Sequence, residues 1–157
     1  MTTHSIANEI QDSSVSTFLR SIDHDFIVVF EVLHVLGILL LLSPLVIINL
    51  RLLGAGLTQK TVGQVFEAFL PFMLTGLIVT VFSGTSLFLT FPVMYYNNPM
   101  FLPKIGLLLV ALALQLTLVF TVTGKTAPSP LFTKSAGLCS LTIWFGIGLA
   151  GRAIGFV

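Results

Sequence analysis

Four long apolar stretches, separated by short polar segments, make up most of this sequence. They cover residues 26–50, 66–92, 104–123 and 135–156. Each is long enough to cross the hydrocarbon core of a bilayer as an α-helix, which takes about 20 residues. The strands of about ten alternating residues that a membrane barrel requires do not occur in the pattern. The sequence therefore predicts an all-α integral membrane protein, a four-helix transmembrane bundle over residues 26–157.

Residues 1–25 form a separate, polar segment rich in serine and threonine. Within it, Val15, Phe18, Leu19 and Ile22 recur at helical spacing, which predicts a short interfacial helix on the membrane surface. For residues 1–12 we favour disorder. The segment carries acidic residues and has no basic region followed by an apolar core, so it is not a cleaved signal peptide. We expect the first span to act as the insertion signal.

Composition supports the membrane assignment and narrows the choice of partners. The chain has 157 residues, of which 55% are hydrophobic and 8% charged, whereas about 25% of residues in a soluble domain are charged. A net charge of +1 gives no reason to expect nucleic acid as a partner. The single cysteine, Cys139, lies inside a span, which excludes a disulfide framework. We expect the lipid bilayer to be the main partner.

Basic residues in the polar segments indicate an orientation. Four spans place both termini and residues 93–104 on one side, and residues 51–65 and 124–134 on the other. The basic residues of the second side are Arg51, Lys60, Lys125 and Lys134, against Arg20, Lys104 and Arg152 on the first. Because cytoplasmic segments carry the excess of lysine and arginine, both termini are predicted outside.

The first span carries the most unusual pair of side chains, Glu31 and His34. Residues three apart share one face of a helix, and ionisable groups within a membrane need a partner or a function. At about 1.5 Å of rise per residue, Glu31 lies roughly 8 Å below the outer end of its span, and Arg152 lies at a similar depth in the fourth span. The outer rim adds further polar side chains at the same end. The predicted polar cluster consists of Glu31, His34, Tyr95, Asn98, Lys104 and Arg152.

Two kinds of role are open for this cluster. In the structural role, Glu31 and Arg152 form an ion pair between spans one and four, and His34 makes a hydrogen bond between helices. In the functional role, His34 binds haem iron, with Lys104 and Arg152 holding the propionates. The other two histidines lie outside the predicted bundle, so the second axial ligand could be Met94, Met100 or a histidine of another subunit. A second possibility for the functional role is that a quinone or another small anionic or amphipathic ligand binds beside His34 and Tyr95.

Motifs for catalysis or a closed metal site are missing from the sequence. Glu-x-x-His is half of a di-iron ligand set, which needs the motif twice and further carboxylates, and it occurs once. No HExxH, Ser-His-Asp or glycine-rich phosphate motif is present. We therefore predict no metal site and no catalytic residues, and interpret the chain as more typical of a non-enzymatic protein.

Glycines in the last span indicate close helix packing. Gly151 and Gly155 form a GxxxG step, which Gly148 extends along the same face. The pattern favours a homo-oligomer or a place in a larger membrane complex.

Several phrases occur in an order that resembles a known family. They are EVLHVLG (31–37), INLRLLG (48–54), YYNNPMFLPK (95–104) and SLTIWFGIGLAGRAIGF (140–156). Together they resemble a bacterial family of small four-helix inner-membrane proteins of unknown function, which is distantly similar to CopD-like and cytochrome b561-like membrane proteins. The resemblance covers about residues 15–157. The matching positions are Glu31, His34, Gly37, Arg51, Asn98, Phe101, Lys104, Trp144, Gly151 and Arg152.

The resemblance implies a fold, a location and a shared polar cluster, but no activity. It implies the bacterial inner membrane, where the outside termini predicted from the basic residues would be periplasmic. Asn49 stands where the family tends to have aspartate, and Gln115 where it tends to have asparagine. The histidine that often follows in the third span is missing here, so a haem ligand that the family uses there would be lost.

From the sequence we expect an accessory or structural subunit of a membrane complex, respiratory or redox in type. The alternative is a redox protein that binds haem b or a quinone through His34. A small transporter is a weaker alternative, because the inner half of the bundle offers only Asn49 and Gln115 as polar side chains.

Overall fold

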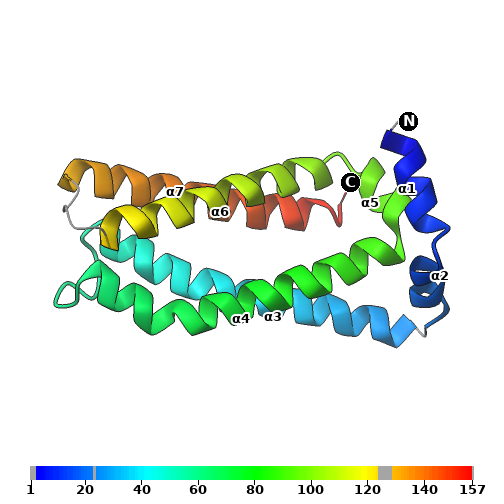
Figure 1. Ribbon diagram of the computed structural model, residues 1–157, viewed down its shortest axis with the longest axis horizontal. Helices are drawn as coiled ribbons and strands as arrows, with labels where there is room; N and C mark the ends of the chain where they lie inside the picture. Colours follow the sequence, from blue (N-terminus) through cyan, green and yellow to red (C-terminus); the bar gives the residue numbers. More distant parts are fainter. Residues whose placement is uncertain (1–2, 23, 124–128, 157) are drawn as a thin grey trace.

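The computed structural model describes residues 3–22, 24–123 and 129–156 and is built from helices (Figure 1). The helices are α1 (Thr3–Gln11), α2 (Ser14–Ser21), α3 (His24–Leu52), α4 (Val62–Thr90), α5 (Pro92–Asn97), α6 (Phe101–Thr123) and α7 (Pro130–Ala153). Four of them run side by side along the long axis, and the short helices α1, α2 and α5 gather at one end with both termini (Figure 1). The predicted four-helix bundle is confirmed.

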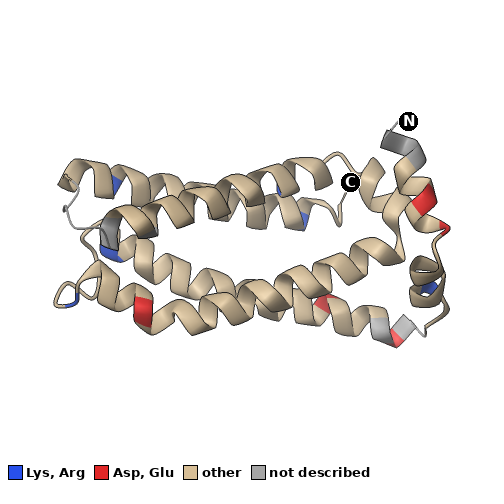
Figure 2. Ribbon diagram, in the orientation of Figure 1, with Lys and Arg blue, Asp and Glu red and all other residues tan. Residues whose placement is uncertain are grey.

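The four long helices contain stretches that are long and apolar enough to cross a membrane. These are Ile27–Leu52, Val62–Thr90, Phe101–Leu118 and Pro130–Ala153. Most of the length of the four helices carries neither Lys and Arg nor Asp and Glu (Figure 2). Exposed apolar side chains such as Phe82, Phe120 and Leu149 would be costly in water and suit contact with lipid. The chain is a multi-pass membrane protein.

Capping residues explain where two of the spans begin. Helix α4 starts four residues earlier than predicted because Thr61 and Gln64 form a capping box, each side chain accepting a backbone N–H of the other residue. Helix α7 starts at Pro130, where the Ser129 side chain accepts the backbone N–H of Phe132. Because of these polar capping side chains, both helices begin before the apolar stretches from which the spans were predicted.

The N-terminal segment is more ordered than we predicted. The helix expected around Val15 and Phe18 is present as α2, and both side chains are exposed. The expectation of disorder is wrong over residues 3–12, because α1 forms and packs against α5, while residues 1–2 lie outside the described residues. Helix α2 is held to the bundle by Ser16, whose buried hydroxyl donates to the carbonyl of Leu89 at the end of α4. The contacts that order this segment come from residues far away in the sequence.

Helices α3 and α4 form the closest pair of the bundle. An added Cβ at Gly76 would lie 2.5 Å from the backbone nitrogen of Leu41 and 2.8 Å from the carbonyl carbon of Leu40. An added Cβ at Gly37 would lie 2.7 Å from Oγ1 of Thr80. Small residues that let two backbones approach are the usual means of helix association in membranes. The tightest glycine contacts therefore lie between α3 and α4, and not on α7 as the sequence pattern indicated.

Helix α3 also supplies the centre of the apolar core. Its buried side chains Leu41, Leu45 and Ile48 face the other spans. The remaining buried members of this cluster are Val65 and Met73 from α4, Ala111 from α6, and Trp144 and Ile147 from α7. Helices α4 and α7 thus pack directly on α3, and α6 adds Ala111 to the same cluster.

We predict that Gly76→Ala lowers the free energy of unfolding by about 1–3 kcal/mol, the usual cost of overpacking a tight contact. The new methyl group would meet backbone atoms of α3, which cannot rotate away. Thermal or denaturant unfolding in detergent would measure the loss. Gly106→Ala is the matched control, because a Cβ there meets no atom within 4 Å. Equal stability of the two variants would contradict the proposed contact.

Candidate functional site

His34 is anchored to helix α4 through one nitrogen of its ring. Nδ1 lies 3.0 Å from the carbonyl oxygen of Thr80 and 3.1 Å from Oγ of Ser83. A carbonyl only accepts, so Nδ1 carries the proton and donates. The Ser83 hydroxyl donates to the carbonyl of Val79 at 2.6 Å, which leaves its oxygen to accept from His34. The predicted hydrogen bond between helices is confirmed, and in the neutral form of the ring the lone pair is then on Nε2.

A glycine of α4 makes room for this ring. An added Cβ at Gly84 would lie 2.8 Å from Cε1 and 3.2 Å from Nδ1 of His34. The ring therefore lies directly against the α4 backbone. The sequence shows Ser83 and Gly84 as small residues in a span, but it gives no sign of which side chain they receive.

Lys104 approaches His34 from helix α6. Its side chain is partly buried, and an added Cβ at Gly151 of α7 would lie 3.3 Å from its Nζ. The ammonium group is close enough to His34 for its charge to act on the ring. Within the described part of the chain, the Lys104 side chain forms no hydrogen bond or ion pair. Three helices thus bring together an imidazole and an ammonium group.

Tyr95 closes the same end of the bundle from helix α5. Its ring centroid lies 5.9 Å from that of Phe101, which stacks on Phe88 at 5.2 Å and 5°. Burial raises the pKa of the Tyr95 phenol, and the charge of the Glu31 carboxylate raises this pKa further. Tyr95 and Glu31 are therefore near neighbours, as the topology predicted.

Asn98 has a structural place in this region. Its Nδ2 donates to the carbonyl of Ile154 at 3.0 Å, and its Oδ1 accepts the backbone N–H of Met100 at 3.0 Å. These bonds hold the turn between α5 and α6 against the end of α7. The same turn positions Lys104 one helical turn later.

The predicted ion pair between Glu31 and Arg152 is wrong. Both side chains are exposed, and among the described residues neither forms an ion pair. The guanidinium carbon of Arg152 lies 4.6 Å from the ring centroid of Phe156, a cation–π contact within the same chain end. Arg152 stands in the last turn of α7, and its exposed side chain lies outside the bundle interior. The cluster therefore divides into a central part, His34 and Lys104, and a peripheral Arg152.

The described residues offer a haem group only one of two axial ligands. Fixing Nδ1 on a carbonyl is how metal-binding histidines are oriented, which leaves Nε2 of His34 as one axial ligand. Met94, considered as its partner, is 58% exposed on α5. Over the ranges that the structure describes, no group of three His, Cys, Asp and Glu side chains gathers. The residues fit a single axial ligand and no more.

The glycines of α7 differ in their surroundings. Gly151 contacts Lys104, whereas an added Cβ at Gly148 would meet no atom within 4 Å, and one at Gly155 only its own helical turn. Packing of Gly148 and Gly155 against another subunit stays a prediction.

Comparison with known proteins leaves the site without a precedent. No family model matches the chain, and no match was found among curated proteins or solved structures.

We predict that Glu31→Gln lowers the pKa of Tyr95 toward its ordinary value of about 10 without reaching it, since burial remains. Removing a nearby negative charge favours the phenolate, which sets the direction. The two tyrosines of the chain are separated in a Tyr96→Phe background, where tyrosinate absorbance reports Tyr95 alone. Glu67→Gln, an exposed carboxylate of α4, serves as the control. An unchanged titration in the Glu31 variant would show that the two groups do not interact.

Proposed function

We propose that this protein is an accessory subunit of a membrane redox system that binds a quinone-type ligand between His34 and Lys104. The observation that carries the proposal is that Nε2 of His34 and the ammonium group of Lys104 lie in the same region, each without a hydrogen-bond partner among the described residues. Nε2 of His34 has a free lone pair, because Nδ1 holds the proton toward Thr80. The ammonium group of Lys104 has donors to spare.

The two atoms match the two forms of a quinone head group. A quinone carbonyl accepts from Lys104, and a quinol hydroxyl donates to Nε2 of His34. The aromatic rings of Tyr95, Phe101 and Phe88 pack on one another at the same end of the bundle, and such rings suit a flat ligand. The protein would supply the orientation of such a ligand.

We predict that Lys104→Met weakens binding of a decyl-substituted benzoquinone roughly 10- to 100-fold, the loss of a charge-assisted hydrogen bond. Calorimetric titration of the full chain in lipid nanodiscs would measure it. Lys60→Met, in the exposed turn before α4, is the control variant and should bind as the unmodified chain does. Equal affinity of the two variants would contradict the proposal.

A visible spectrum separates haem from quinone as the ligand. A purified protein with a Soret band that disappears in His34→Ala would replace the quinone proposal by a haem site. A colourless protein that binds the benzoquinone supports the quinone site.

Assembly with another membrane protein is the part of the proposal that rests on α7. Gly148 and Gly155 leave a smooth, open strip on this helix, and such strips are where helices of different chains pack in membranes. Crosslinking in native membranes would reveal the partner, and a monomer at all protein concentrations would argue against assembly.

A further inference from the structure

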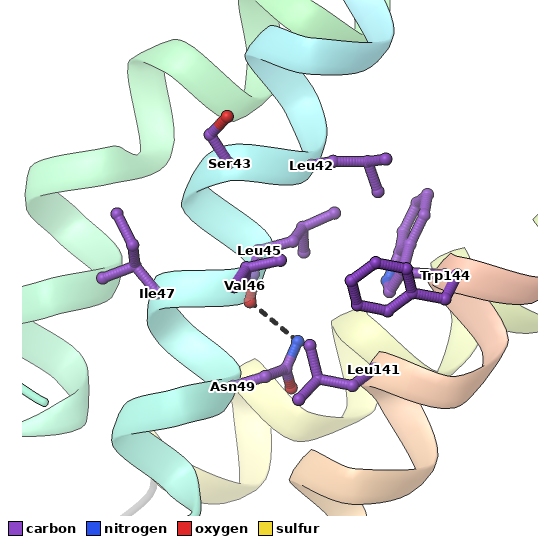
Figure 3. A pocket seen from close by; sticks show the side chains of 9 residues that line it. Leu42, Ser43, Leu45, Val46, Ile47, Asn49, Leu141 and Trp144 are labelled. Carbon is purple, nitrogen blue, oxygen red and sulfur yellow. Dashed lines mark hydrogen bonds between the residues drawn. The ribbon is translucent and has the colours of Figure 1, made fainter. Parts of the chain in front are cut away.

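A groove between α3 and α7 lies in the other half of the bundle, away from His34 (Figure 3). Its volume is about 380 Å³, within the range of small-molecule sites. Much of its wall is apolar, from Leu42, Leu45 and Val46 of α3 and Leu141 of α7. Asn49 and Trp144 also line it, one from each helix.

Both of these polar side chains are buried and incompletely bonded. Asn49 is 0% exposed and Trp144 is 4% exposed. Asn49 donates from Nδ2 to the carbonyl of Leu45 at 2.8 Å, a bond within its own helix that Figure 3 shows as a dashed line. Its Oδ1 accepts no hydrogen bond from the described residues, and Nε1 of Trp144 donates none. A buried free acceptor and a buried free donor thus belong to two side chains that line one apolar groove, and leaving their hydrogen bonds unmade costs free energy.

The groove opens toward lipid. Ser43 and Phe145, which also line it, are exposed side chains of two membrane-spanning helices. Asn49 lies three residues before the end of α3 at Leu52, so its amide stands near the membrane interface. Leu42 and Val46 lead from it toward the middle of the membrane. The groove therefore has a polar end near the membrane interface and an apolar part that continues toward the membrane centre.

The layout defines the chemistry of the occupant. No charged side chain lines the groove among the described residues, so the ligand is neutral. It must donate one hydrogen bond, to Oδ1 of Asn49, and accept one, from Nε1 of Trp144. It must also carry an apolar chain that reaches the groove from the bilayer.

We propose that this groove binds a neutral acylglycerol lipid. Its free hydroxyl donates to Asn49, its ester carbonyl accepts from Trp144, and one acyl chain lies along Leu42 and Val46. The site is separate from the one between His34 and Lys104 and does not depend on it.

The proposal can be tested by tryptophan fluorescence of the unmodified chain, because Trp144 is its single tryptophan. Dioleoylglycerol added to the protein in phosphatidylcholine nanodiscs should shift the Trp144 emission in a saturable way. The O-methyl ether of this lipid, which cannot donate, and the dialkyl ether analogue, which has no carbonyl, should each bind roughly three- to tenfold more weakly. Equal binding of all three lipids would overturn the proposal, as would a response that never saturates. A decyl benzoquinol that saturates the signal where dioleoylglycerol fails would also overturn it.

Asn49→Leu removes the acceptor while keeping the branching of the side chain, and should weaken dioleoylglycerol binding by the same factor. Gln115→Leu is the matched control. This buried amide accepts from Ser140 at 3.3 Å and lies outside the groove lining, so its loss should leave binding unchanged. Equal effects of the two substitutions would overturn the proposal. Should Asn49→Leu fail to fold by circular dichroism, Trp144→Phe decides, with bound lipid counted by native mass spectrometry, where undiminished binding would overturn the proposal.

Discussion

The close approach of α3 and α4 at Gly76 is the contact on which the bundle depends. At this point the backbone of α4 lies against the backbone of α3 at Leu40 and Leu41. Pro44 lies inside α3 and has no N–H, so the carbonyl of Leu40 loses its helical partner. A side chain at position 76 would stand over this same stretch of backbone. The glycine therefore lets α4 cover a part of α3 whose regular hydrogen bonding is interrupted, in a solvent that offers no replacement.

The place of His34 follows from this approach. Two turns farther along α4 from Gly76, Gly84 again leaves room, and the histidine ring fills it. The carbonyl of Thr80 then fixes the proton of the ring on Nδ1. Helices α6 and α7 complete the region from the opposite side, where Asn98 holds the α5–α6 turn to the end of α7. Helix packing at Gly76, at Gly84 and at the α5–α6 turn thus determines which polar groups meet at this end of the bundle.

Sequence patterns located the spans well because apolar length alone determines which segments can cross a membrane. They missed α1, since its contacts with α5 are made across most of the chain. They placed Glu31 and Arg152 toward the same end of the bundle but did not give their contacts. Rise per residue fixes how deep a side chain lies, while rotation about the helix axis depends on packing that no local pattern encodes. The same limit hid the roles of Gly84 and Ser83, and it directed attention to the glycines of α7 instead of Gly76.

The distance between His34 and Asn49 along α3 determines which part of the membrane each of them faces. His34 and Asn49 are fifteen residues apart, about 22 Å along a helix, and the hydrocarbon core is about 30 Å thick. Each side chain therefore belongs to a different leaflet of the bilayer. A lipid-soluble molecule in one leaflet meets only one of the two sites, and it must flip across the membrane before it can reach the other. A single helix thus gives the two leaflets different chemistry to recognise.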